Sequence, residues 1–310
     1  MTTQATNARP ESPLDAEPIE APALSAATRP LYWSVRRELW ENRSIYLAPL
    51  AVAALFLVGF FFALVRLPER MRAASALAPL QRQEAIEQPY VIVAIMLMAI
   101  AMLVAVFYSL DALYGERRDR STLFWKSMPV SDLTTVLAKA SVPILVIPLV
   151  TFAVTMAATF LMLLLSGVVL AASGLGFSTP WTEVPFLEAA GIHFVHLVGF
   201  HGLGYAPLYG WLLLVSAWAR RAPFLWATLP PLAIGALERL ALGTSHFARL
   251  VQARLLGGPM SDTPAGGMTM EMFAPDPWRV LVDPGLWIGV AVGAAVLLAA
   301  VQLRRARGPI

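Results

Sequence analysis

Long hydrophobic runs without charges are the feature that most constrains how this chain can fold. The clearest is IYLAPLAVAALFLVGFFFAL, residues 46–65, which contains no charged side chain. A helix needs about 20 such residues to cross the hydrocarbon core of a bilayer. Of the 310 residues, 58% are hydrophobic and 14% are charged, whereas about a quarter are charged in a soluble domain. The sequence therefore predicts an all-α integral membrane protein.

Six such runs predict six transmembrane helices. They cover residues 46–65, 90–110, 141–172, 191–218, 222–242 and 285–303. The third run is longer than a bilayer requires, so we expect its helix to be tilted, kinked or partly outside the membrane. The fifth run contains Pro223, Pro230 and Pro231 and ends in a charged pair, so a broken helix is an alternative there.

The distribution of Arg and Lys predicts the orientation of these spans. With six crossings both termini lie on one side, and that side carries 15 basic residues against 8 on the other. Cytoplasmic loops carry the excess of basic residues in membrane proteins. We therefore expect both termini of a multi-pass membrane protein in the cytoplasm.

The first 28 residues are predicted to form a disordered cytoplasmic tail. They are rich in Ala, Pro, Thr and Glu, and they contain no apolar run that could bury a core. Acidic residues occupy the positions where a signal peptide would have a basic start and an apolar stretch. The remaining chain, residues 29–310, is predicted to be one transmembrane domain.

Residues 29–45 are predicted to form an amphipathic helix that lies in the membrane interface. Its apolar arc, projected at 100° per residue, consists of Leu31, Tyr32, Val35 and Leu39, extended by Trp33 and Trp40. Its opposite, polar face consists of Arg37, Glu38 and Glu41. Such a helix either anchors the chain at the headgroups only, or also remains available to a partner.

Composition excludes several classes of function. The chain has no Cys, which excludes disulfides and thiolate chemistry. A P-loop places Gly directly before its Lys, but Trp125 precedes Lys126 and Ala138 precedes Lys139. The net charge of +3 is too small and scattered to favour nucleic-acid binding. Because no hydrolase motif or pair of acids occurs in a span, we expect no catalytic residues and no enzyme activity on this chain.

The loop at residues 111–140 is the most densely charged stretch, and its pattern predicts a helix, a break and a second helix. Glu116 and Arg120 are spaced to support a first helix, which Pro129 ends. Ser131 is a suitable N-cap for a second helix, with Asp132 in its first turn. Exposed aromatic residues between the two helices fit either a docking element or a solvated loop.

The run ERRDRSTLFWKSMPVSD, residues 116–132, resembles the first cytoplasmic loop of ABC-2 type transporter permeases. The resemblance implies that two permease subunits, as a homodimer, form an export pathway for an amphiphilic substrate such as a lipid, peptide or drug-like compound. It also implies two cytoplasmic ABC ATPase subunits that bind ATP and Mg, while this chain carries no cofactor and contacts membrane lipid. The exporter that the resemblance implies is expected in the bacterial inner membrane. The alternative is an ATP-independent channel or an ion-coupled secondary transporter.

The same resemblance implies which residues contact the ATPase. These lie in the interfacial helix and in the charged loop: Arg36, Arg37, Glu38, Glu116, Arg117, Arg118, Asp119, Arg120, Phe124 and Trp125. We interpret them as ATPase-coupling residues.

Three further features have both a structural and a functional interpretation. His193, His196 and His201 lie in the fourth span, where they either pack between helices or line the pathway; their spacing does not favour a metal site. Small residues recur every fourth position at Gly285, Gly289 and Gly293 and favour close helix packing, either within the chain or across a dimer. The outer segment 243–284 is expected to be a flexible loop or, as the resemblance implies, to include a short helix around Arg249, Arg254 and Leu255.

Overall fold

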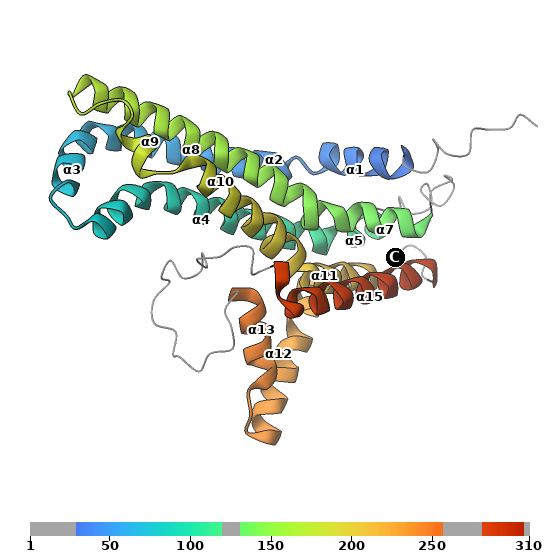
Figure 1. Ribbon diagram of the computed structural model, residues 1–310. Helices are drawn as coiled ribbons and strands as arrows, with labels where there is room; N and C mark the ends of the chain where they lie inside the picture. The colour runs from blue at the N-terminus through green and yellow to red at the C-terminus, as the bar shows by residue number, and fades with distance from the viewer. Residues whose placement is uncertain (1–28, 120–130, 257–280, 307–310) are drawn as a thin grey trace, which may run out of the picture.

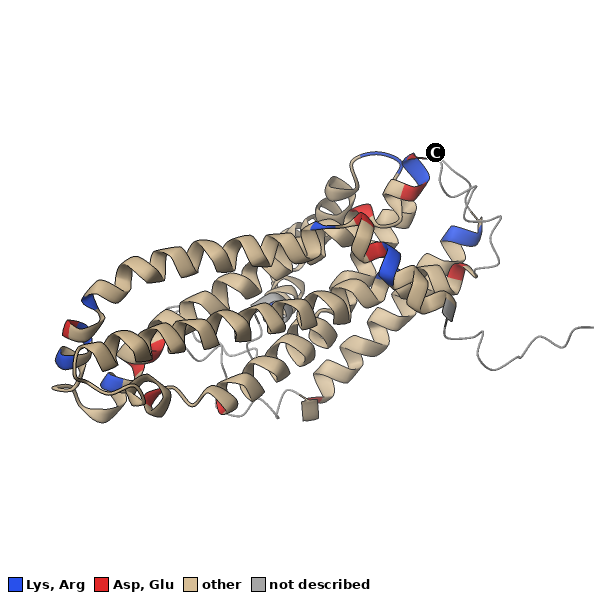
Figure 2. Ribbon diagram, turned by 90° about the horizontal axis from the view of Figure 1, so that it is seen from above, with Lys and Arg blue, Asp and Glu red and all other residues tan. Residues whose placement is uncertain are grey.

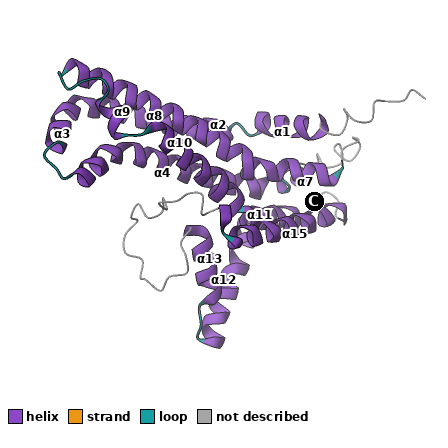
Figure 3. Ribbon diagram, viewed as in Figure 1, coloured by secondary structure: helices purple, strands orange, loops and turns teal. Residues whose placement is uncertain are grey.

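The computed structural model describes residues 29–119, 131–256 and 281–306. Within these ranges every secondary-structure element is a helix and none is a strand (Figure 3). The predicted all-α fold is therefore confirmed for the described part of the chain.

The first half of the chain forms a series of helices joined by short connections. In order they are α1 (Arg29–Glu41), α2 (Ser44–Ala63), η1 (Leu64–Arg66), α3 (Leu67–Ala74), α4 (Pro79–Asp111), α5 (Tyr114–Arg118) and α7 (Asp132–Ser141). The second half continues with η2 (Val142–Val146), α8 (Ile147–Ala172), α9 (Thr179–Glu183), α10 (Phe186–Phe194), η3 (Val195–Gly204), α11 (Ala206–Trp218), α12 (Pro223–Leu242), α13 (His246–Leu256) and α15 (Pro284–Ala306). The segments η2 and η3 are π-helical.

The long helices α2, α4 and α8 lie side by side in an elongated bundle (Figure 1). Helices α3 and α9 close one end, and α1, α5, α7 and the end of α15 gather at the other. Five helical stretches of the described chain have the length and hydropathy to cross a membrane. They are Ser44–Ala74, Pro79–Arg118, Asp132–Ala172, Phe186–Gly204 and Pro284–Ala306. The chain thus has the character of a multi-pass membrane protein.

Charged residues gather mostly toward the two ends of the bundle, and few lie along its long middle (Figure 2). This separation follows from the cost of placing a charge in hydrocarbon. One ion pair, between Arg82 and Glu183, joins α4 to α9 at the end formed by α3 and α9.

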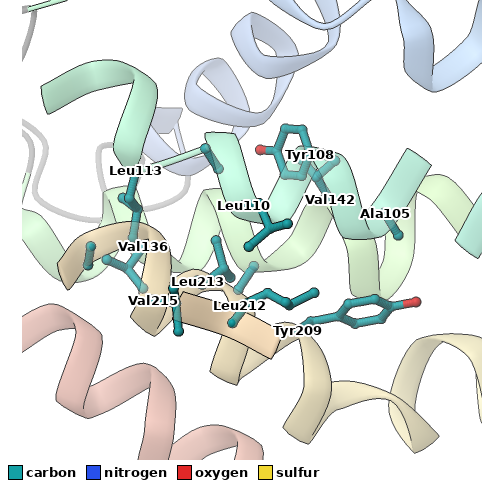
Figure 4. Close-up of a cluster of buried hydrophobic side chains, with 14 of the residues drawn as sticks. Ala105, Tyr108, Leu110, Leu113, Val136, Val142, Tyr209, Leu212, Leu213 and Val215 are labelled. Carbon is teal, nitrogen blue, oxygen red and sulfur yellow. The ribbon is translucent and has the colours of Figure 1, made fainter. Parts of the chain in front are cut away.

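A buried apolar cluster joins the helices at the end of the bundle where α1 lies. Leu113, Val136 and Leu213, from three different segments, are almost fully buried in it. Figure 4 shows these side chains between the ribbons of α4, α7 and α11, with Tyr209 on the side of α11. The cluster fixes the end of α4 and the start of α5 against α11, and it includes Tyr108, which also belongs to the site described below.

The fifth expected span, residues 222–242, is not among the five spanning stretches. A continuous helix α12 does form there, with Pro230 and Pro231 inside it, so the helix is not broken. In Figure 1 it runs steeply away from the bundle with α13, and Ala227 is its only buried residue. The prolines and the charged pair Glu238–Arg239 lower the hydropathy of this helix, which explains the difference. Within residues 243–284, the described helix α13 agrees with the expectation of a short helix around Arg249 and Arg254.

Candidate functional site

Six side chains form a buried polar network where five helices meet, and we call them the charge cluster. They are Glu38, Tyr108, Glu116, Asp132, Lys139 and Arg304. Five of the six are buried, and only Asp132 is partly exposed. Each of α1, α4, α5 and α15 contributes one residue and α7 contributes two, so the cluster ties together segments that are far apart in the sequence.

Lys139 lies at the centre of the charge cluster. Its Nζ is 2.8 Å from Oε1 of Glu38 and 3.2 Å from Oε1 of Glu116. The Tyr108 hydroxyl donates to the other Glu38 oxygen at 2.8 Å. Lys139 therefore joins α1 to α5 through α7, and Tyr108 adds α4 to the same contact.

Arg304 forms the second half of the charge cluster from the last turn of α15. Its Nη1 is 2.6 Å from Oε2 of Glu116, and its Nε is 2.9 Å from Oδ1 of Asp132. Glu116 thus lies between the two cations. The cluster contains three carboxylates and two cations. Because both cations share Glu116, each of them has two acidic partners.

Local sequence signals place α7 so that both of its ends enter the charge cluster. The Ser131 hydroxyl accepts a hydrogen bond from the Thr134 backbone amide at 3.1 Å, which confirms the predicted N-cap. Asp132 lies in the first turn of the helix, where the helix dipole favours a negative charge, and Lys139 lies in the last turn, where it favours a positive one. The dipole of α7 therefore stabilises both the Asp132 carboxylate and the Lys139 ammonium group.

Burial of this many charges stabilises the fold only if the partners compensate for lost hydration. A buried ion pair often adds little net stability, but removing one partner leaves a buried charge alone and costs about 3–5 kcal/mol. In the charge cluster Glu38 accepts bonds from Lys139, Tyr108 and Asn42. The five helices are therefore difficult to separate one at a time.

A second polar contact fixes α5 to the end of α11. The Ser216 hydroxyl accepts hydrogen bonds from the backbone amides of Leu113 at 3.0 Å and Tyr114 at 2.8 Å. Arg117 is buried, and its guanidinium donates to the backbone carbonyls of Ala217 and Ala219 near the C-terminus of α11. A cation at this position also satisfies carbonyls that the helix leaves free.

The structure divides the predicted ATPase-coupling residues into buried and exposed groups. Glu38, Glu116 and Arg117 are buried in contacts within the chain. Arg118 and Asp119 are exposed and 3.0 Å apart between Nε and Oδ1. The remaining loop residues, Arg120, Phe124 and Trp125, lie outside the described residues.

Helix α1 differs from its predicted amphipathic pattern at Glu38. This residue was expected on the polar face, but it is 4% exposed, while Trp33 and Trp40 are 55% and 67% exposed. The charge cluster is the reason, because Lys139 and Tyr108 pair with the Glu38 carboxylate inside the protein.

The exposed side of α1 carries a compact aromatic and basic surface. The Arg36 guanidinium carbon lies 5.1 Å from the ring centroid of Trp33 and 4.9 Å from that of Trp40, at distances typical of cation–π contacts. Arg37 pairs with Glu41 at 2.6 Å one turn further along. Trp33, Trp40 and Glu41 are exposed, and Arg36 and Arg37 are partly exposed.

The three histidines lie along α10 and η3. The Nδ1 atom of His193 is 2.9 Å from the Ala189 carbonyl oxygen, while His196 and His201 lie in η3 beside aromatic rings of Phe200 and Tyr205. Among the described residues no group of His, Asp or Glu is arranged to hold a metal ion. Whether the histidines line a pathway stays a prediction.

Helix α15 packs closely against α11, and Gly293 lies at this contact. A Cβ at Gly293 would lie 2.9 Å from the backbone carbonyl carbon of Ala206, and Gly289 is also buried. A Cβ at Gly285 would instead meet the Asp283 carboxylate at 3.1 Å. Close packing within the chain thus occupies Gly293, and a dimer contact at these positions stays a prediction.

Sequence reasoning did not find Tyr108, Lys139 or Arg304 as members of one site. One signal was present, because Lys139 is one of only two lysines and directly precedes a long apolar run. A lone charge at that position requires a partner inside the protein or at the headgroups. Which partner it has depends on how the helices pack.

No family model, curated protein or solved structure matches this chain. Its membership of a family therefore rests on no comparison, and the resemblance of residues 116–132 to ABC-2 type permeases stays a prediction. The architecture is that of an all-helical chain with five helices able to cross a membrane and a buried charge cluster at one end of the bundle.

Proposed function

We propose that this chain is the permease subunit of an ATP-driven exporter, with its charge cluster at the cytoplasmic end of the bundle. The single observation that carries the proposal is the joining of α1, α5, α7 and α15 through Lys139 and Arg304. A membrane subunit driven by a separate motor needs a rigid element between the motor and its helices. The charge cluster supplies such an element.

The exposed surface beside the charge cluster suits the motor contact. Arg36, Trp33 and Trp40 lie on the outer side of α1, and Arg118 and Asp119 are exposed at the end of α5. Arginine and aromatic residues are enriched in protein interfaces. A partner that pushes on this surface would move α1 and α5 together, because Glu38 and Glu116 share Lys139.

The proposal includes two copies of this chain, two ATPase subunits and nucleotide-driven exchange between two packings of the permease helices. The buried residues Glu38, Glu116 and Arg117 then transmit the movement, and the exposed residues receive it. The substrate is proposed to be an amphiphile, which enters the bundle from the membrane or its surface.

The test is to purify the full-length protein with the ATPase subunit that accompanies it, and to measure ATP hydrolysis and transport in proteoliposomes. Asp119→Arg reverses an exposed charge next to the charge cluster, so it should lower coupled ATP hydrolysis without affecting membrane insertion. The matched control is Glu69→Arg, the same type of change at an exposed position on α3, at the opposite end of the bundle.

Two results would contradict the proposal. One is equal activity of the Asp119→Arg and Glu69→Arg proteins. The other is transport by the purified chain without any ATPase subunit or ATP, which would favour a channel or an ion-coupled transporter.

A further inference from the structure

A cavity of about 310 Å³ lies between α4, α8 and α10, near the end of the bundle opposite the charge cluster. Its volume is within the range of sites that hold small organic molecules. Met156 of α8 and Ile192 of α10 give it apolar walls, and Tyr90 of α4 and Phe186 of α10 add aromatic rings. The cavity therefore offers apolar contact to most of a bound molecule.

The charged groups of this cavity are all acidic. Glu87 of α4 and Glu188 of α10 contribute carboxylates to the lining, and His193 contributes an imidazole. No lysine or arginine is among the residues that line it. The cavity thus combines an apolar body with negative charge.

Neither carboxylate is neutralised by a cation of the described chain. Glu87 accepts a hydrogen bond from the Gln83 side-chain amide at 2.9 Å, which is a neutral partner. Arg82, the nearest arginine along α4, pairs with Glu183 instead. In the parts of the chain that the structure describes, no ion pair reaches Glu87 or Glu188. A positively charged ligand in the cavity would therefore face two carboxylates, and no lysine or arginine of the described chain would compete with it for them.

The aromatic rings favour the same kind of ligand. Phe186 is held in a group with Phe160 and Trp181, at centroid distances of 6.0 and 6.4 Å. The faces of aromatic rings attract organic cations, and the attraction increases when water is excluded. Tyr90 of α4 also lines the cavity, and its hydroxyl is 3.3 Å from the Ser166 hydroxyl.

We propose that the cavity between α4, α8 and α10 binds a hydrophobic organic cation, with its positive group between Glu87 and Glu188 and its apolar body against Met156 and Ile192. An ammonium or phosphonium group on an apolar body has the required chemistry. This inference narrows the substrate class of the proposed exporter, and it rests on that proposed function only for the claim that the bound molecule is transported.

The test uses two probes of nearly the same size and shape but opposite charge, tetraphenylphosphonium and tetraphenylborate. Saturable binding of each is measured on the purified full-length protein in an uncharged maltoside detergent. Wild-type protein should bind the phosphonium cation more tightly than the borate anion. This comparison requires no variant, so it does not depend on whether a substituted protein folds.

Variants then locate the binding. The double change Glu87→Gln and Glu188→Gln removes both charges and keeps the side-chain volume, so phosphonium affinity should fall roughly tenfold. Ala189→Phe, a change in the lining, should also reduce binding because it fills the cavity. Glu84→Gln is the matched control, because this exposed residue of α4 does not line the cavity and affinity should not change.

A lipid ammonium headgroup and a free organic cation would share this chemistry. Competition with lyso-phosphatidylethanolamine and lyso-phosphatidylglycerol distinguishes them. Stronger competition by the ethanolamine lipid supports the cation site and identifies a lipid as its occupant, whereas equal, weak competition supports a free cation.

Equal affinity for the two probes, or unchanged phosphonium affinity in the double variant, would overturn the inference. Neither result concerns the proposed function, since binding is measured without an ATPase subunit. Conversely, a failure of ATP-coupled transport would leave the binding result intact.

Discussion

Lys139 Nζ lies 2.8 Å from Glu38 Oε1, and the two side chains are only 4% and 5% exposed although 101 residues separate them. This contact fastens the N-terminal helix α1 to α7. Because Lys139 also reaches Glu116, the same ammonium group fastens α5. The charge cluster is therefore the main polar link among the helices at this end of the bundle.

Replacing Lys139 should strongly destabilise the protein. Lys139→Met removes the cation shared by Glu38 and Glu116 and leaves two buried carboxylates close together, at a cost of about 3–5 kcal/mol. The loss should appear as a lower unfolding temperature of the purified protein, followed by tryptophan fluorescence in detergent. Arg37→Met is the control, because it breaks a more exposed pair with Glu41 worth about 0.3–0.5 kcal/mol. Similar unfolding temperatures of the two variants would show that the charge cluster does not stabilise the fold.

The contact between the two π-helical segments depends on a glycine. A Cβ at Gly202 in η3 would overlap the carbonyl oxygen of Ile144 in η2. Gly202→Ala should therefore push the segments apart and cost about 1–3 kcal/mol, the usual penalty of overpacking. Gly191→Ala tests the same change in α10, where a Cβ meets nothing within 4 Å. It should be neutral or slightly stabilising, since alanine favours a helix over glycine. Equal losses in both variants would refute a specific role for the close approach of η2 and η3.

Acid should loosen the turn between α12 and α13. The Glu238 carboxylate accepts hydrogen bonds from the Phe247 amide at 2.8 Å, the Thr244 hydroxyl at 2.8 Å and the His246 amide at 2.6 Å. These bonds, chiefly the one from Phe247, lower the pKa of Glu238. Because the folded pKa is depressed, the stabilisation is present above the pKa of an unfolded glutamate, about 4.3, and is lost as the pH falls through the folded pKa.

Hydrogen exchange over residues 246–252 measures this effect, after correction for the intrinsic pH dependence of exchange. Protection in wild-type protein should fall as the solution is acidified through the folded pKa of Glu238. Glu238→Gln keeps an acceptor oxygen but cannot titrate, so its protection should not change with pH. If protection in both proteins had the same pH dependence, a titrating cap at Glu238 would be excluded.

The sequence predicted the features that depend on neighbouring residues. Uncharged runs indicated helices able to cross a membrane, and α2, α4, α8 and α15 form where they were expected. The Ser131 cap was also readable, since a cap acts within one helical turn. The predicted break at Pro129 lies outside the described residues. Residues 222–242 form the continuous helix α12, but this helix is not one of the five spanning stretches, so a sixth span is not confirmed.

The candidate site could be predicted only in outline. Glu38 and Glu116 were recognised as important acids, but on a surface for a partner rather than in the charge cluster. The helical projection placed Glu38 with the polar residues, because such a projection assumes that charged side chains face water. It cannot include Lys139, which lies on another helix and makes burial of the carboxylate favourable.

By itself the sequence determined the helical class of the protein, the places where most helices lie and the absence of thiol and P-loop chemistry. Only the tertiary structure decided that Glu116 pairs with Arg304 across 188 residues, and that Glu38 pairs with Lys139. The physical reason is the sequence distance over which each interaction acts. Hydrophobic runs and caps act over a few residues, whereas the pairing of charges depends on which helix ends pack together.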